Sequence, residues 1–191
     1  MNRTVLVAIV ALAAPVPTLA QGATFGVTGG WYLPYATAPF SSNSGWNIGA
    51  VLRLGSPLRP LALRVDATYS DVGTTLSYTV PDAGTLAVSN QIRIWSATGN
   101  VVWTIFGNDR PTALYVIGGV GFYYVQQIVE DFPGYALYRN ALGYNGGLGF
   151  RYDRVFIEAR WNSIQSVTNF TAFGSGGGNV EFLPINAGVF F

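Results

Sequence analysis

Six charged residues of this chain fall on one side of segments in which polar and apolar residues alternate. They are Arg53, Arg64, Asp66, Arg151, Glu158 and Arg160. Carboxylates and guanidinium groups gathered in one place could form a catalytic or transport site. However, arginines that outnumber the carboxylates would hold them ionised, which does not suit acid–base chemistry. We therefore interpret the six residues as a buried network of ion pairs and hydrogen bonds that plugs an interior.

Side chains for other chemistries are missing. The chain has no cysteine and no histidine, so disulfides and thiolate metal sites are excluded. A Ser or Asp nucleophile would lack a histidine base, and arginine stays protonated in proteins. The Gly-Gly-Val-Gly run at 118–121 lies in an alternating segment with no helix after it, so it is not a phosphate-binding loop. We expect no enzyme, and no catalytic residue, metal or cofactor.

The two ends of the chain have distinct patterns, and the first 20 residues predict a cleaved signal peptide. Arg3 precedes the apolar run Val5–Ala14, which is too short to span a bilayer as a helix. Prolines follow at once, which disfavours the alternative of a buried N-terminal helix. Cleavage after Ala20 leaves residues 21–191, which we expect to form one domain.

The composition conflicts with an ordinary soluble domain. Hydrophobic residues make up 50% of the chain, charged residues only 10%, and the mean hydropathy is +0.32. Yet no stretch after residue 20 has the ~20 consecutive apolar residues of a membrane helix. The near balance of ten basic and nine acidic residues gives no electrostatic footprint for a nucleic-acid partner.

Alternation of apolar and polar residues resolves this conflict. The alternating segments are 24–33, 45–54, 61–70, 91–106, 113–126, 140–152, 155–168 and 180–191. Only helices and closed barrels can satisfy the backbone inside lipid. The pattern therefore predicts an all-β fold, an eight-stranded antiparallel up-and-down transmembrane β-barrel.

The two faces of these segments predict two environments. In segment 61–70, Leu61, Leu63 and Val65 point one way, and Arg64 and Asp66 point the other. Aromatic residues gather near the ends of the apolar faces, as in the girdles at the lipid–water interfaces. They are Trp31, Trp46, Tyr69, Trp95, Tyr124, Phe150, Tyr152 and Phe191. A soluble sandwich, or a lipocalin-like ligand-binding barrel, would instead bury the apolar face.

The connections alternate in length, as expected for short periplasmic turns and long extracellular loops. Short ones are 55–60, 107–112 and 153–154, and long ones are 34–44, 72–90, 127–139 and 169–179. Alternation at 76–80 indicates that the hairpin of the longest loop extends beyond the membrane. Candidate contact residues in the loops are Tyr35, Phe40, Tyr78, Phe132, Tyr135, Tyr138, Phe170 and Phe173. Packing of these rings against one another is the alternative.

The last strand carries an apolar outer face that ends in an aromatic residue. Its members are Leu183, Ile185, Ala187, Val189 and Phe191. This pattern is typical of the C-terminal strand of bacterial outer-membrane barrels. Together with segments 114–123, 141–152 and 156–161, it resembles the family that includes the membrane domain of OmpA and OmpX-like proteins. The resemblance is clearest over residues 94–191.

The resemblance implies a monomer in the bacterial outer membrane, with lipid and lipopolysaccharide as partners. It also implies insertion by the barrel assembly machinery, which recognises the last strand. Members of the family act in adhesion, envelope integrity, serum resistance or small-solute passage, and the fold does not decide among these roles. The leading hypothesis is a structural or interaction protein that displays its loops. A narrow or gated pore is the alternative, and a soluble lipocalin-like barrel is the third.

Overall fold

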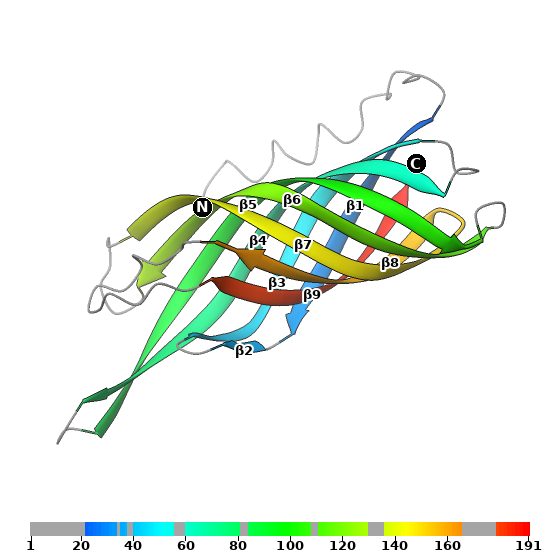
Figure 1. The fold of residues 1–191 in the computed structure, drawn as a ribbon. Coiled ribbons are helices and arrows are strands. Elements are labelled where there is room, and N and C mark those ends of the chain that lie inside the picture. Colours follow the sequence, from blue (N-terminus) through cyan, green and yellow to red (C-terminus); the bar gives the residue numbers. More distant parts are fainter. Residues whose placement is uncertain are drawn as a thin grey trace, which may run out of the picture.

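A computed structural model describes residues 22–33, 35–37, 40–55, 60–80, 84–107, 111–129, 136–165 and 179–191. The predicted signal peptide lies outside these residues. Each strand of the described part runs antiparallel to its neighbours in one sheet (Figure 1). The strands are β1 (Ala23–Leu33), β2 (Tyr35–Thr37), β3 (Phe40–Leu54), β4 (Leu61–Val80), β5 (Gly84–Phe106), β6 (Thr112–Val129), β7 (Ala136–Tyr152), β8 (Val155–Ile164) and β9 (Val180–Phe190).

The sheet closes on itself because β1 pairs with both β9 and β3. Gly26 lies opposite Phe190 on one side and opposite Val51 on the other. The short β2 pairs only with β3 in the described chain, so the closed barrel has eight strands, β1 and β3 to β9. Closure gives every strand two neighbours, which satisfies the backbone hydrogen bonds that lipid cannot. The prediction of an eight-stranded antiparallel barrel is confirmed.

The strands extend further than the sequence predicted at one end. Segment 34–44 was expected to be a loop, but β2 and the start of β3 occupy part of it, because two strands that pair with each other in water need no apolar face. The predicted extension of the hairpin in segment 72–90 is confirmed, because β4 continues to Val80 and β5 begins at Gly84. Conversely, β8 ends at Ile164, and residues 166–168 lie outside the described part.

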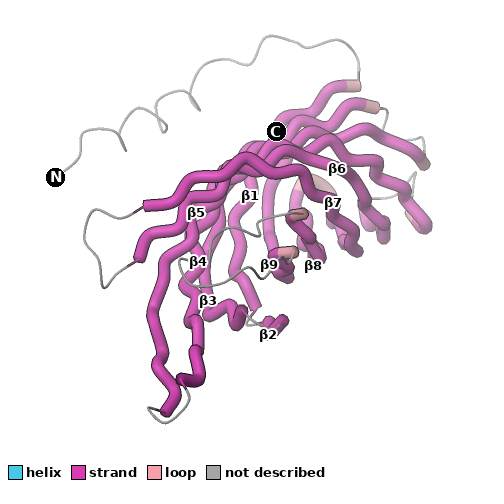
Figure 2. Tube along the Cα trace, turned by 60° about the vertical axis from the view of Figure 1, so that its left-hand side comes forward, coloured by secondary structure: helices cyan, strands magenta, loops and turns pink. Residues whose placement is uncertain are grey.

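The β4–β5 hairpin projects from the barrel (Figures 1 and 2). Register pairs run without interruption from Leu61↔Trp103 to Val80↔Gly84. The pairing of β4 with β3 reaches Leu76, and that of β5 with β6 stops at Asn90. The tip of the hairpin therefore stands beyond its described neighbours. We call this end of the barrel the hairpin end and the opposite one the turn end.

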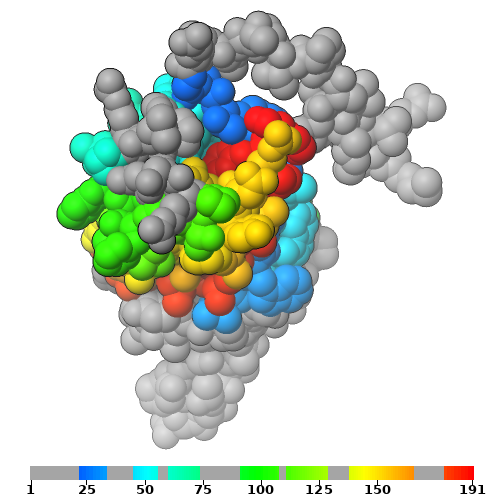
Figure 3. All heavy atoms as spheres, turned by 90° about the vertical axis from the view of Figure 1, so that its right-hand side faces the viewer, coloured from blue at the N-terminus to red at the C-terminus, as the bar shows by residue number. Residues whose placement is uncertain are grey.

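Tight connections close the turn end. Tyr152 and Val155 are register partners, so only Asp153 and Arg154 link β7 to β8. Asp153 has a φ of 52°, a left-handed conformation that Asp tolerates better than most residues. The start of β1 and the end of β9 also lie at this end, where blue and red residues lie side by side in Figure 3.

The outer wall is apolar, as the alternation predicted. Leu63 is 58% exposed and Val120 is 69% exposed, whereas the neighbouring Arg64 is 2% exposed. Aromatic pairs ring the hairpin end, with centroid distances of 5.6 Å for Trp46–Tyr69, 4.6 Å for Tyr69–Trp95 and 6.1 Å for Tyr124–Tyr138. Such a continuous exposed apolar surface needs lipid around it. Within the described residues, no helix is long and apolar enough to cross a membrane.

A charge placed on the middle of this wall is expected to destabilise the barrel in lipid. Val120 lies near the centre of β6, so Val120→Arg should cost about 2–4 kcal/mol of unfolding free energy. Thr112→Arg, at the exposed start of the same strand, should cost about 0–1 kcal/mol. The measurement is denaturant unfolding in phospholipid vesicles, followed by tryptophan fluorescence. Equal costs at the two positions would show that the wall does not face lipid.

Candidate functional site

Four charged residues meet in the middle of the barrel and form a closed ring of ion pairs. Arg64 Nε lies 2.7 Å from Asp66 Oδ1, and Arg160 Nη1 lies 3.0 Å from Asp66 Oδ2. Arg160 Nη2 lies 2.6 Å from Glu158 Oε2, and Arg64 pairs with Glu158 as well. We call these four residues the ion quartet. Each arginine contacts both carboxylates, so the two signs balance inside the quartet.

The ion quartet joins opposite walls of the barrel. Arg64 and Asp66 lie on β4, and Glu158 and Arg160 lie on β8. In the order of the closed sheet, β5, β6 and β7 separate the two strands on one side, and β3, β1 and β9 separate them on the other. The ion pairs Arg64–Glu158 and Arg160–Asp66 therefore cross the full width of the interior.

Neutral donors complete the ion quartet. The Tyr115 hydroxyl donates to Glu158 Oε1 at 2.5 Å, and Asn100 Nδ2 donates to Asp66 Oδ2 at 2.7 Å. The Arg64 guanidinium also lies over the Phe156 ring, 4.8 Å from its centroid. Buried ion pairs are tolerated only when their remaining lone pairs and protons find partners. Strands β5 and β6 supply these partners, so the network draws on four strands.

A glycine makes room for the Tyr115 ring. Gly149 lies opposite Tyr115 on one side and opposite Glu158 on the other. A Cβ at position 149 would run into the ring and hydroxyl of Tyr115. The ring therefore reaches across β7 to the carboxylate because the intervening strand presents no side chain. The same arrangement recurs where Phe156 lies over Gly188.

Apolar side chains cover the ion quartet from both ends. Towards the hairpin end lies a cluster formed by Tyr32, Val72, Ile92, Ile94, Tyr123, Val125, Ala141, Ile164 and Phe182. Towards the turn end lie two smaller clusters, of Ala62, Val102, Tyr115 and Ile117 and of Val51, Phe156 and Phe190. The described interior is therefore layered, with charge in the centre and apolar residues on either side.

The described cavities on the two sides of the ion quartet are small. One of about 40 Å³ touches Asp66, Arg160, Tyr32 and Phe182, and one of about 10 Å³ touches Arg64 and Tyr115. The first has room for water, and the second is at the lower limit for one molecule. Polar atoms around the first cavity have no hydrogen-bond partner among the described residues, and they include Tyr123 Oη and the side-chain amide of Asn47.

The six charged residues expected in one network divide into two groups. The structure brings Arg64, Asp66, Glu158 and Arg160 together, and all six are buried. Arg53 and Arg151 lie nearer the turn end, and no described carboxylate is within 4.0 Å of either guanidinium. The sequence analysis did not assign Tyr115 and Asn100 to the network. Both occupy inward positions of their strands, which is the only sequence pattern that could have indicated them.

The predicted insertion residues form the outer face of the last strand. Leu183, Ile185, Ala187 and Val189 point away from the buried Pro184 and Asn186. Phe191 follows β9, is exposed, and stacks on Phe25 with centroids 6.3 Å apart. Their recognition by the assembly machinery stays a prediction.

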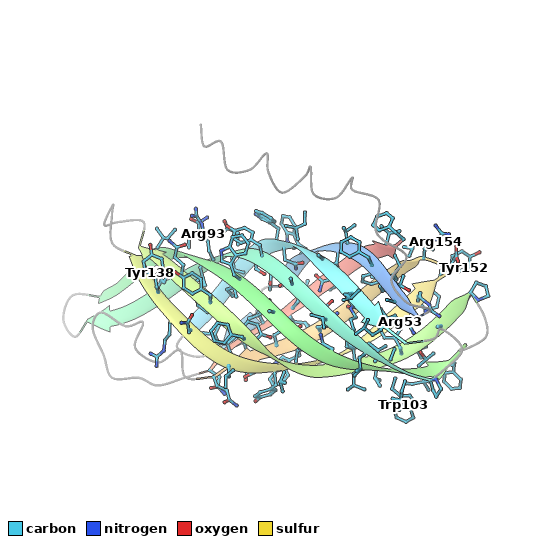
Figure 4. The ribbon with its side chains drawn as sticks, turned by 90° about the horizontal axis from the view of Figure 1, so that it is seen from above. Arg53, Arg93, Trp103, Tyr138, Tyr152 and Arg154 are labelled. Atoms are coloured by element: carbon cyan, nitrogen blue, oxygen red, sulfur yellow. The ribbon has the colours of Figure 1, made fainter. Side chains whose placement is uncertain are left out.

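The predicted loop contacts lie partly in strands. Tyr138 belongs to β7, is exposed and stacks on Tyr124 at the hairpin end (Figure 4). Tyr35 and Phe40 lie in β2 and β3 rather than in a loop, and Tyr78 lies in β4, in the predicted extension of the hairpin. A role of these residues in contacts stays a prediction. The remaining candidates, Phe132, Tyr135, Phe170 and Phe173, lie outside the described residues.

Comparison with solved structures finds matches to bacterial proteins at low sequence identity. The outer membrane protein OprG of Pseudomonas aeruginosa matches with a TM-score of 0.52 at 13% sequence identity, over 89% of this chain and 96% of OprG. Ail is the attachment invasion locus protein of Yersinia pestis, and its structure was solved with the heparin analogue sucrose octasulfate. It matches with a TM-score of 0.46 at 13% sequence identity, over 88% of this chain and 97% of Ail. The N-terminal β-barrel domain of Pseudomonas aeruginosa OprF matches with a TM-score of 0.43 at 14% sequence identity, over 90% of this chain and 98% of that domain.

No protein-family model matches the chain, and neither does any curated protein sequence. The structural likeness therefore shows the fold alone: this chain is a closed eight-stranded antiparallel β-barrel that resembles OprG. The exposed apolar wall of the barrel fits a lipid environment.

Removing one member of the ion quartet is expected to destabilise the barrel strongly. Glu158→Ala leaves Arg64 and Arg160 short of a partner and should cost about 3–5 kcal/mol of unfolding free energy. The matched control is Arg93→Gln, because Arg93 forms an ion pair at the surface. Its Nε lies 3.8 Å from Asp71 Oδ2, and 39% of the Arg93 side chain is exposed. A surface pair of this kind is worth about 0–1 kcal/mol. Denaturant unfolding measures the free energy of unfolding of both variants. Similar small losses in the two variants would show that the ion quartet does not hold the barrel together.

Proposed function

We propose that the protein is an integral outer-membrane protein with a structural or interaction role rather than an enzymatic one. In this proposal the barrel is a closed anchor, and the hairpin end presents its strands and loops to the outside of the cell. The observation that carries the proposal is the ion quartet, whose ion pairs cross the interior between apolar layers. We further propose that the protein works as a monomer with lipid and lipopolysaccharide around it, after insertion by the assembly machinery.

The arrangement of the interior supports an anchor over a pore. An eight-stranded barrel is just wide enough for its own side chains to fill it. Here the filling consists of side chains that bond to each other from opposite walls, and Arg160 and Glu158 are 7% and 2% exposed. A solute or ion would have to separate these charges in a low-dielectric environment, which is costly. The apolar outer wall likewise disfavours a soluble lipocalin-like barrel, whose apolar face would point inwards.

The lengths of β4 and β5 support a display role. A tilted strand needs about 9–11 residues to span a membrane. β4 has 20 residues and β5 has 23. About half of this hairpin therefore stands outside the membrane on the hairpin end. Such a ribbon offers a surface that a partner can contact without disturbing the barrel.

Planar-bilayer recording tests whether the barrel is closed. The purified wild-type protein is expected to show no steady ion conductance, because the ion quartet and its apolar layers block the path. A general porin recorded under the same conditions serves as the positive control. Stable single-channel steps in the wild type that change in size with Arg64→Ala would overturn the closed anchor and establish the pore.

Shortening the hairpin tests whether the barrel folds without the projecting part of β4 and β5. Residues 77–87 can be replaced by a two-residue Asn-Gly turn that joins Leu76 to Val88, which are register partners. The shortened protein should keep the electrophoretic shift between unheated and boiled samples that marks a closed barrel. Loss of that shift would show that the projecting strands are needed for folding and are not only a display element.

A further inference from the structure

A cavity of about 210 Å³ opens at the turn end of the barrel. It is lined by Thr24, Arg53, Gly55, Arg151, Asp153, Arg154, Phe190 and Phe191. Figure 4 shows Arg53 and Arg154 at this same end of the barrel, and Figure 3 views the molecule from it. This volume is smaller than that of pockets for drug-sized ligands, whose volumes start at about 300 Å³. A small group is therefore the ligand that fits.

The cavity contains two buried cations that have no carboxylate within 4.0 Å among the described residues. Arg53 and Arg151 are 8% and 9% exposed, and the Nε of each has no hydrogen-bond partner in the described part of the chain. Both side chains line this cavity and the smaller one below the ion quartet. Asp66 and Glu158 do not compensate them, because their oxygens pair with Arg64 and Arg160. A buried charge of this kind is costly unless it is paired, so the site is suited to an anion.

The number and type of these groups specify the anion. The side chains of three arginines and one aspartate line the cavity, so the net charge of these side chains is about +2, the terminal carboxylate of Phe191 not counted. Guanidinium groups bind phosphate and carboxylate oxygens through paired N–H donors. A free phosphate group carries about −1.5 to −2 charges at neutral pH and offers three or more acceptor oxygens, whereas a carboxylate carries one charge and offers two oxygens. The phosphodiester of a phospholipid head group carries one charge. We propose that the turn end of the barrel is a phosphate-binding site formed by Arg53, Arg151 and Arg154.

Two sources could supply this phosphate, and the cavity is open to both. Phe190 faces the interior of the barrel, and Phe191 faces the outer wall, beside Phe25. The site thus lies between the mouth of the barrel and the inner lipid leaflet. The ligand is either a free phosphate group from the periplasm or the head group of a phospholipid.

Thermal unfolding in a maltoside detergent, which contains no phosphate, tests the site and its ligand. Inorganic phosphate is added in one arm and short-chain phosphatidylglycerol in the other, with sodium chloride at constant ionic strength and acetate as the carboxylate control. A ligand that binds the folded state raises the midpoint of unfolding. We expect phosphate or the lipid, but not acetate, to raise it, and the double variant Arg53→Gln/Arg151→Gln to weaken binding on the order of tenfold or more.

Variants keep the test independent of folding. Arg154→Gln lies on the exposed turn and should weaken binding by a few fold without affecting the barrel. Arg93→Gln, at the hairpin end, should bind as the wild type does (Figure 4). A response to inorganic phosphate identifies a free phosphate group, and a response to the lipid alone identifies a head group. No response in either arm, or an equal response from the double variant, would overturn the proposal.

Discussion

The narrowness of an eight-stranded barrel is the constraint on which the rest of this structure depends. Its interior has room for side chains and little else, so each inward residue must fit against residues from the opposite wall. A large inward side chain on one strand is therefore accommodated by a glycine on the neighbouring strand, as where Tyr115 lies over Gly149. Charges in such a space must also find partners there, and the crossing pairs between β4 and β8 meet this requirement.

The ion quartet bears on the choice of strand register as well as on the stability of the barrel. Each of its strands presents an arginine and a carboxylate two positions apart, so both point inwards. A slip of one residue in the register of β4 would turn Arg64 and Asp66 towards lipid and the leucines inwards. Buried ion pairs often add little net stability over apolar packing. We infer that their larger effect is on strand register, because a slip that turns these charges towards lipid is far less favourable than the native pairing.

Alternation in the sequence predicted which residues face lipid and which face the interior, but it predicted the extent of the strands only in part. The membrane segment of β4 was placed at 61–70 because the apolar face ends there, and the alternation at 76–80 indicated the extension that backbone pairing carries to Val80. It gave no sign of β2 or of the start of β3. Nor could the sequence show that Arg53 and Arg151 stand apart from the ion quartet. That division depends on which strands lie opposite each other and on how far they are staggered. The contacts of Tyr115 and Asn100 depend on the same stagger.

The closed centre gives the two ends of the barrel separate environments. The ion quartet and its apolar layers lie between the cavity at Arg53 and Arg151 and the hairpin end. In the proposed orientation, the cationic cavity faces the periplasm and the inner leaflet. The hairpin can contact a partner without moving any charge in the core. One rigid element thus separates two surfaces, which is the property that an anchor requires and a pore lacks.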